Sequence, residues 1–293
     1  MKGNQVKATT RNRFFPFVTL RVRMTRKNEK GVVLILTLAI VLILAVLVME
    51  FRYLATIELQ SATSFGEEMK AGYLSKAGIS YGINMLRHDN NEFDSLSEEW
   101  AKTIEKPFSF SLGEGTVEIS IVDEDSKLLF DEKMKDESGE ERRMQAERLF
   151  EYLKVDTSLN SIKDKIPFVT SAELILATGP ELSDYGTVMS SGLININTAK
   201  EAILKSLEIY TSLDGLAEKV LEYRETNPFK TTAEVQSGLG DNYYKPIQGL
   251  ITTESHFFSI VSKAVLGDNK KTVRAVVKRD KDSIKTLYWR LER

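Results

Sequence analysis

Three consecutive acidic residues are the first candidates for chemistry in this chain. Asp123, Glu124 and Asp125 follow a segment of alternating apolar residues, at the point where a strand would end. Carboxylate oxygens are the hard ligands that Ca²⁺ prefers, and a turn can gather several of them. No loop here has the spacing of a defined calcium motif, so a solvated acidic turn is the alternative. The sequence therefore predicts these three residues as calcium candidates, with that alternative open.

The remaining residue types do not form a recognisable catalytic site. The 293-residue chain has no cysteine, which excludes disulfides, cysteine nucleophiles and thiolate metal sites. His88 and His256 are far apart, without a flanking ligand pattern, and we expect ordinary surface or packing histidines. The formal net charge of −2 gives no basic balance that would indicate a nucleic-acid partner. We therefore predict a structural protein rather than an enzyme.

The element that most constrains the function is an apolar run near the N-terminus. Residues 32–49 carry no charge, and Thr37 is the only polar residue among them. As a helix, the run would be about 27 Å long, close to the apolar thickness of a bilayer. Basic residues precede the run, namely Arg21, Arg23, Arg26, Lys27 and Lys30. This asymmetry predicts a cytoplasmic N-terminus, with the remainder of the chain across the membrane.

The two ends of the run separate several kinds of membrane segment. A secretory signal peptide would have a shorter apolar core and a small-x-small cleavage site, but residues 47–52 read LVMEFR. A plain single-span anchor is another alternative. A basic leader that ends in Gly31, with the apolar run starting at Val32, resembles the class III signal of type IV pilins and pseudopilins. That resemblance implies cleavage by prepilin peptidase between Gly31 and Val32. Translation from Met24 would give the compact leader MTRKNEKG.

Helical spacing continues beyond the apolar run to about residue 87, followed by a polar linker to about residue 106. One side of this helix lacks bulky side chains, because it carries the small residues Ala71, Gly72, Ala77, Gly78 and Gly82. Two explanations stay open: other backbones approach this side, or the helix packs closely on its own sheet.

Period-two alternation predicts strands on both sides of a long central region. The predicted strands cover residues 108–112, 117–121, 257–266, 272–277 and 284–291. The turns that join them contain Gly, Asp and Asn, which tolerate positive φ. One long helix with antiparallel strands at both ends predicts an α+β fold.

The central region, residues 132–252, is predicted to be an all-α insertion. Its expected helices cover residues 140–153, 171–177, 198–207, 213–226 and 233–236. Ser171 is the expected cap of the second helix, and Thr231 or Thr232 that of the last.

The insertion contains a second motif: GLININTA at residues 192–199, followed by YR at 223–224 and NPF at 227–229. It resembles both the helix-hairpin-helix DNA-binding domain and the insertion of the K-type minor pseudopilin of type II secretion systems. DNA binding by such a hairpin needs a Gly-x-Gly turn whose amides face a phosphate. Residues 210–216 instead read YTSLDGL, with one glycine and with Asp214, which would repel a phosphate.

The other interpretation of this segment is a two-helix packing motif. In it, Ile194 and Ile196 are buried, and Asn197 or Thr198 caps a helix. Tyr223 and Phe229 close the core.

The order of segments resembles the K-type minor pseudopilin from residue 31 to about residue 277. Most pilins have Glu as the fifth mature residue, whereas this chain has Leu36, and absence of that Glu is typical of the K-type family. The resemblance implies a pilin-like fold and a single subunit at the pseudopilus tip that starts assembly and supports export across the outer membrane. The alternative is a membrane-tethered DNA-binding protein.

The resemblance also implies surroundings for the chain. The expected partners are the I-type and J-type minor pseudopilins, the major pseudopilin and prepilin peptidase, with no nucleic acid. Calcium is known in this family, and processing with methylation of the new N-terminus is expected. The chain would be a single-pass inner-membrane protein with most of its residues in the periplasm.

These predictions divide the chain into five parts. They are a leader at 1–31, an N-terminal helix at 32–88 that spans the membrane at 32–49, a first β region at 89–131, the insertion at 132–252, and C-terminal strands at 253–293.

Overall fold

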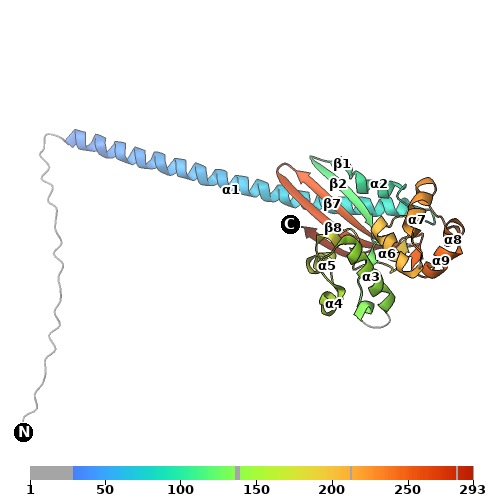
Figure 1. Cartoon of the computed structure of the whole chain (residues 1–293). Coiled ribbons are helices and arrows are strands. Elements are labelled where there is room, and N and C mark those ends of the chain that lie inside the picture. Colours follow the sequence, from blue (N-terminus) through green and yellow to red (C-terminus); the bar gives the residue numbers. More distant parts are fainter. Residues whose placement is uncertain (1–28, 136–138, 212, 282, 293) are drawn as a thin grey trace, which may run out of the picture. The chain divides into compact units, whose positions relative to one another are not determined.

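The computed structural model describes residues 29–135, 139–211, 213–281 and 283–292 (Figure 1). The chain forms two compact units, Met1–Ala62 and Thr63–Arg293. Helix α1, Glu29–His88, contributes its first part to one unit and its last part to the other. Most of the predicted leader, including Met24, lies outside the described residues.

The second unit is built on a five-stranded antiparallel sheet with the order β1-β2-β7-β8-β9. The strands are β1 Phe108–Leu112, β2 Gly115–Asp123, β7 Phe257–Leu266, β8 Asn269–Asp280 and β9 Ser283–Glu292. All five predicted strands are present. The α+β class with an antiparallel sheet is confirmed.

The second half of α1 packs against one face of this sheet. Strand β2 alternates as predicted, and Val117, Ile119 and Ile121 are fully buried on the helix side. The small helix residues explain the close approach: a Cβ on Gly78 would lie 2.0 Å from Ser262 Oγ, and one on Gly82 would lie 2.8 Å from Ile260 Cγ2. For these two glycines, the explanation that the helix packs closely on its own sheet is therefore correct. Gly72 has open space beside it.

The predicted linker 89–106 contains a short helix, α2, Glu99–Glu105, so that part of the prediction is wrong. Trp100 is buried and makes an edge-to-face contact with Phe258 at 5.1 Å between ring centroids. The buried Thr103 Oγ1 accepts a hydrogen bond from the backbone N–H of Ile121 at 2.8 Å. Packing on the sheet therefore stabilises a helix too short to be stable by itself.

The insertion leaves the sheet after β2 and returns at β7, and these two strands are neighbours. Its helices are α3 Glu140–Leu153, α4 Leu159–Ile162, α5 Ser171–Thr178, α6 Glu201–Thr211, α7 Leu216–Thr226, α8 Thr232–Leu239 and α9 Asp241–Ile247. The 3₁₀ turns in the described part of this region are η1 Glu132–Lys135, η3 Lys163–Lys165 and η4 Pro180–Leu182. The caps of α5 and α8 are Thr170 and Thr231, whose hydroxyls accept from Glu173 N and Glu234 N. Ser171, the predicted cap, is the first residue inside α5.

The insertion is helical but not all-α, which corrects that prediction. Two short parallel ladders occur at its base: β3, Leu128–Leu129, pairs with β4, Gly186–Thr187, and β5, Ile194–Asn195, pairs with β6, Ile251–Thr252. Two-residue strands have no detectable alternation in sequence, so only tertiary pairing reveals them.

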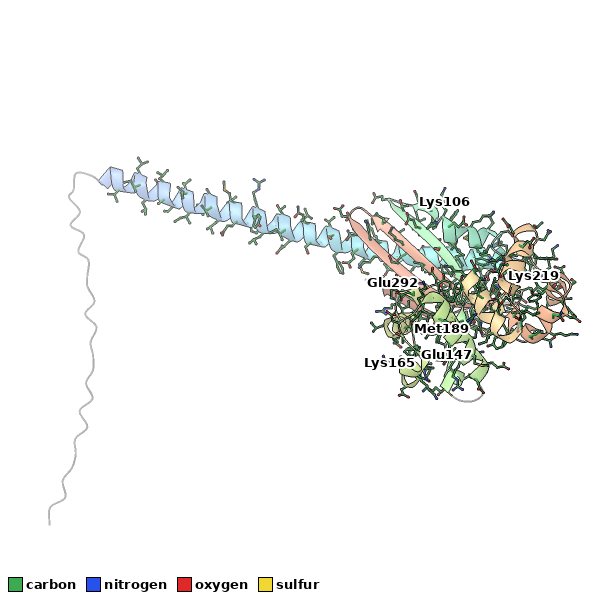
Figure 2. The ribbon with its side chains drawn as sticks, in the orientation of Figure 1. Lys106, Glu147, Lys165, Met189, Lys219 and Glu292 are labelled. Carbon is green, nitrogen blue, oxygen red and sulfur yellow. The ribbon has the colours of Figure 1, made fainter. Side chains whose placement is uncertain are left out.

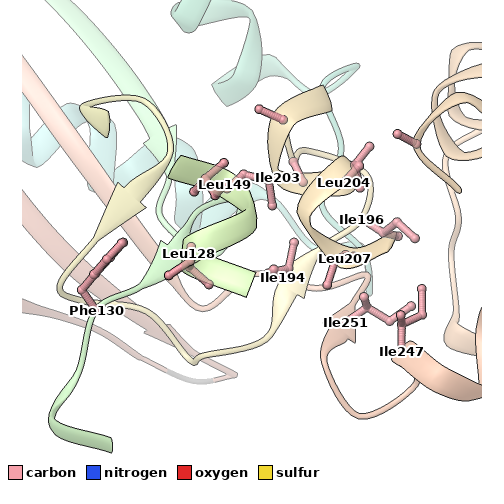
Figure 3. Close-up of a cluster of buried hydrophobic side chains, with 14 of the residues drawn as sticks. Leu128, Phe130, Leu149, Ile194, Ile196, Ile203, Leu204, Leu207, Ile247 and Ile251 are labelled. Atoms are coloured by element: carbon pink, nitrogen blue, oxygen red, sulfur yellow. The ribbon is translucent and has the colours of Figure 1, made fainter. Parts of the chain in front are cut away.

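A hydrophobic core of its own supports the insertion (Figure 3). Leu149 from α3 lies beside Ile203 of α6, and both are fully buried. The ring of Tyr223 stacks on the buried ring of Phe229 at 4.2 Å between centroids and 4° between planes. Ile194 and Ile196 are buried in the same core. The predicted burial and ring packing of this motif are therefore confirmed. Its predicted cap is wrong, since α6 begins at Glu201 and the side chains of Asn197 and Thr198 bond Phe229 and Asp123 instead.

Candidate functional site

The predicted cleavage and assembly residues lie in the first turns of α1. Gly31, Val32 and Leu36 are all helical and exposed. Every residue from 31 to 65 is exposed, and side chains project from all sides of this part of the helix (Figure 2). Among the described residues, α1 is the one helix long and apolar enough to cross a membrane. An uncovered apolar surface of this length indicates a single-pass anchor.

The acidic triplet is buried, so the alternative of a solvated turn is wrong. Asp123, Glu124 and Asp125 have at most 4% of their surface exposed. Unpaired carboxylates are costly to bury, so the hydrogen-bond partners of each one determine what it can do.

Asp123 is surrounded by hydrogen-bond donors. Its Oδ1 accepts from the N–H of Asp125 at 2.8 Å, and its Oδ2 accepts from Ser255 Oγ at 2.6 Å and from Thr198 Oγ1. Asn195 Nδ2 lies 3.4 Å from the same oxygen. Burial and then the charge of Asp125 raise the pKa of Asp123 to about 8, while the hydroxyl donors oppose that shift.

Asp125 is bonded at once to the middle of the insertion and to its C-terminal end. Its Oδ1 accepts from Ser190 Oγ at 2.7 Å and from the N–H of Ser191 at 2.6 Å. Its Oδ2 accepts from the N–H groups of His256 and Phe257, at 2.6 and 3.1 Å, where β7 begins. Both oxygens are therefore already used by protein donors.

Glu124 turns to the opposite side and pairs with Lys127 at 3.1 Å. Burial opposes its ionisation, but the charge of Lys127 and the nearby hydroxyls outweigh burial and lower the pKa of Glu124. The three acidic residues therefore do not point into a common space, and the structure brings no calcium ligand set together from them.

The GLININTA motif supplies the donors that hold this junction. Asn195 Nδ2 donates to Ser255 Oγ at 2.7 Å and to the carbonyl of Asp94 at 3.2 Å. Asn197 exchanges two hydrogen bonds with the backbone of Phe229, both at 2.8 Å. The two asparagines and Thr198 thus connect the sheet to both halves of the insertion. We call the buried set Asp94, Asp123, Asp125, Asn195, Thr198 and Ser255 the junction network.

A second acidic group was not predicted from the sequence. Asp89, Asp94 and Glu98 each place a carboxylate oxygen within 4.8 Å of the others, an arrangement that could hold a metal ion. Arg279 pairs with Asp89 at 2.9 Å and bonds Asp94 Oδ1 at 2.6 Å. Burial raises the pKa of Asp94 to about 7, and Arg279 opposes the rise. The three acids are close together in sequence, in the segment 89–98, whereas Arg279 comes from the far end of the chain, so the spacing of the acids was the local signal and only the fold adds the arginine.

The hairpin between α6 and α7 carries an acid where a bound phosphate would need free amides. Glu208 Oε1 accepts from the N–H of Ala217 at 3.1 Å, in the first turn of α7. Lys205, the basic residue on the facing helix, pairs with Glu218. Gly215 precedes α7 with φ of 91°, a conformation that favours glycine. Ser212 of this hairpin lies outside the described residues.

The two histidines have structural partners in the described part of the chain. His88 Nδ1 lies 2.8 Å from the carbonyl of Asn84 at the end of α1. His256 Nδ1 lies 3.2 Å from the carbonyl of Arg279.

Comparison with known proteins shows that this architecture occurs in another protein. No protein-family model and no curated protein sequence matches the chain. A solved structure does: one chain of the GspK-GspI-GspJ complex of the type 2 secretion system from enterotoxigenic Escherichia coli. The two share 14% identity with a TM-score of 0.61, and the match covers 79% of this chain and 99% of the other.

The chain has the pseudopilin fold. At 14% identity the likeness concerns the fold, and it does not distinguish the K-type from other minor pseudopilins. In the pseudopilin fold described here, the junction network occupies the point where the insertion joins the sheet.

Proposed function

We propose that this chain is the K-type minor pseudopilin of a type II secretion system. The observation that carries the proposal is the place of the insertion: a large helical unit with its own core leaves a pilin-like sheet between neighbouring strands β2 and β7. The matched E. coli chain belongs to a complex named for three minor pseudopilins, and almost its whole length is covered. In this role the chain is a structural subunit that works with I-type and J-type minor pseudopilins and the major pseudopilin.

The proposal includes processing of the N-terminus. Prepilin peptidase would cut between Gly31 and Val32, with methylation of the new terminal amine. N-terminal sequencing of the protein extracted from membranes should start at Val32 in cells with the peptidase and not in cells without it. Gly31→Leu should block the cut, because a bulky side chain would not fit where the peptidase needs glycine. A chain that keeps Lys30, or that is cut beyond Met49, would contradict this function.

The proposed position is the tip of the pseudopilus. A carboxylate inside the bilayer costs about 2.5–3.5 kcal/mol unless it is paired, and the leading subunit has no terminal amine ahead of it. Leu36 is the apolar residue that suits such a subunit. The insertion would also obstruct tight stacking of many copies, whereas one copy at the end meets no clash. Antibody to the insertion should therefore label one end of sheared pseudopili, and regular decoration of the shaft would refute the tip position.

Leu36→Glu separates this position from that of a shaft subunit. We expect the variant to be processed normally and to gain nothing in assembly, since its carboxylate finds no amine. An increase in the number of copies along the shaft would contradict the tip assignment.

Calcium binding belongs to the proposal through the second acidic group. Asp89, Asp94 and Glu98 are the described residues with suitable oxygens, although Arg279 already supplies them with positive charge. Calcium titration by calorimetry decides whether calcium or Arg279 neutralises these acids. Binding that Glu98→Gln abolishes supports a calcium site, and heat indistinguishable from that of buffer supports Arg279 as the permanent counter-ion.

A further inference from the structure

A cleft of about 750 Å³ lies between the insertion and the face of the sheet opposite α1. Residues from the segments 169–175 and 183–189 form one wall, and residues of β2, β7, β8 and β9 form the other. Met189 and Glu292, both labelled in Figure 2, belong to these two walls. The volume is within the range of ligand-binding sites in proteins, about 300–1,000 Å³.

The sheet wall of the cleft is built from two rows of side chains. One row is paired in register across four strands and consists of Val122, Ser259, Val276 and Tyr288. Residues paired directly across strands present their side chains on the same face of a sheet. The next row along the same strands adds Val261, Arg274 and Arg290. The wall is therefore apolar at its centre, with polar groups at both ends.

The buried end of the cleft contains two polar atoms without a partner. Glu124 and Ser259 are only 4% and 2% exposed, and in the described part of the chain neither Glu124 Oε2 nor Ser259 Oγ makes a hydrogen bond. The other oxygen of Glu124 pairs with Lys127 at 3.1 Å, and Thr187 Oγ1 bonds the backbone of Met189 instead. Buried polar atoms without hydrogen bonds are unfavourable, so a ligand that supplies these bonds would be stabilised here.

The chemistry of these two atoms selects the group that would bind them. The Glu124 carboxylate only accepts hydrogen bonds, whereas the hydroxyl of Ser259, which lies near it, can donate one. Because Lys127 already balances the charge of Glu124, a neutral N–H suits this end better than a cation. A peptide group carries an N–H donor and a C=O acceptor, so one peptide group can bond both atoms.

The exposed end of the cleft is positively charged. Arg290 pairs in register with Arg274, so two cationic side chains are direct neighbours on β8 and β9. Arg274 Nε bonds Glu292 Oε1 at 2.7 Å, whereas Arg290 has neither an ion pair nor a hydrogen bond with any described residue. Like charges directly opposite each other destabilise a sheet, and a bound anion would relieve the repulsion. The fork of a guanidinium matches a carboxylate through two parallel hydrogen bonds.

The distance between the two ends fits a short extended peptide. Two strand spacings and one row separate Ser259 from Arg290, which amounts to about 12 Å. An extended chain covers about 3.3–3.6 Å per residue, so about three or four residues span the cleft. The valines between the ends favour apolar side chains over a sugar, whose hydroxyls would lie on this apolar surface.

We infer that this cleft binds the C-terminal end of a polypeptide. Its free carboxylate would bond Arg290, its apolar side chains would contact the valines, and a peptide group would bond Glu124 and Ser259. Capture of a terminal carboxylate is one of the recurring modes of peptide recognition. The inference rests on the unpartnered buried atoms and the arginine pair, and it stands independently of the proposed function.

Isothermal titration calorimetry tests the inference with the full chain in discs of phosphatidylcholine and with empty discs as the blank. The probe is the peptide acetyl-Val-Ala-Val with a free C-terminal carboxylate. Two comparison ligands each lack one feature: the same peptide with a C-terminal amide has no anion, and hexanoate has no peptide group. We expect the probe to bind at least about tenfold more tightly than either of them.

Substitutions separate the two ends of the cleft. Arg290→Gln should weaken binding of the probe by about tenfold and change binding of the amide-capped peptide by less than about twofold. Ser259→Ala should weaken both peptides by about fivefold, since its hydroxyl contacts the peptide group. This variant should not lower the melting temperature, because Ser259 Oγ has no partner to lose. The matched control is Arg148→Gln, an exposed arginine of α3 outside the cleft, which should bind within about twofold of the parent.

Four results would overturn the inference. No binding of the probe up to about 10 mM would mean that water alone satisfies the two buried atoms. Equal affinity for the amide-capped peptide would remove the terminal carboxylate from recognition. Hexanoate that binds as tightly as the probe would reduce the cleft to an anion site. An equal loss of affinity in Arg148→Gln and Arg290→Gln would mean general attraction by positive charge.

Discussion

Ser255 Oγ donates a hydrogen bond to Asp123 Oδ2 at 2.6 Å, although 132 residues separate the two in sequence. Asp123 is the last residue of β2, and Ser255 stands just before β7. The bond therefore closes the base of the insertion, at the point where the chain leaves the sheet and returns to it. Because both residues are buried, the relative position of insertion and sheet depends on polar groups that water does not screen.

Removing the amide of Asn195 should loosen this base. Its Nδ2 reaches Ser255 and Asp94, and its Oδ1 accepts from the N–H of Asn197 at 3.0 Å. Asn195→Ala leaves buried groups without partners, and we expect a loss of about 2–4 kcal/mol in the free energy of unfolding. Urea unfolding of the full chain in detergent, followed by near-UV circular dichroism, measures it. Asn160→Ala, an exposed position, is the control and should change stability by less than about 0.5 kcal/mol.

Stability should fall as the pH rises from 6 to 9. The folded pKa values of Asp94, about 7, and Asp123, about 8, lie above the ordinary value of 3.8, so the folded state binds more protons than the unfolded state over that window. The contribution of these two groups to the free energy of unfolding is fully present below pH 3.8, and it is lost as the pH rises through 7 and 8. We expect a decrease of about 1–4 kcal/mol between pH 6 and pH 9.

Asp123→Asn isolates the source of that dependence. The variant removes one of the two titrating groups, so its free energy of unfolding should depend less steeply on pH than that of the parent, whatever its absolute stability. A slope equal to that of the parent would mean that Asp123 stays ionised throughout, held by its four donors.

Two glycines of α1 should respond in opposite directions to the same change. Gly78→Ala places a methyl group 2.0 Å from Ser262 Oγ and 2.7 Å from Val117 Cγ1, and we expect a loss of about 1–3 kcal/mol. Gly72→Ala meets nothing within 4 Å and should stabilise the helix by about 0.5–1 kcal/mol. Thermal unfolding of both variants measures the contrast.

Ser262 provides a rescue for the glycine variant. Its hydroxyl is buried and has no hydrogen-bond partner among the described residues, so Ser262→Ala loses little. The double variant with Gly78→Ala should recover part of the lost stability. If the two effects simply add, the clash with Ser262 is not the cause.

Duplex DNA should bind no more tightly than non-specifically. Glu208 holds the N–H of Ala217, and Lys205 is paired with Glu218, so neither that amide nor that lysine is free to bind a phosphate. We expect dissociation constants in the range of about 10⁻⁴–10⁻⁶ M at physiological salt, measured by fluorescence anisotropy with the full chain. Nanomolar, salt-sensitive binding that Gly215→Val removes would instead favour a DNA-binding hairpin.

The elements of this protein follow from local sequence where the signal is strong. The apolar run at 32–49 and the alternation of Val117, Ile119 and Ile121 predict a membrane helix and a half-buried strand from side-chain type and period alone. Helix α3 begins and ends where its pattern predicts. Helix α2 was missed because it is short, and only the burial of Trp100 against Phe258 explains why it forms.

The chemistry of the acidic triplet was decided by tertiary structure alone. By sequence, Asp123 and Asp125 are charged residues after a strand, equally compatible with a metal site or with solvent. Their donors come from Ser190, Thr198 and Ser255, which are 65 to 132 residues away. Since a buried carboxylate is defined by the groups that surround it, the sequence determined that acids stand at this junction, and the fold determined that they bind the protein itself.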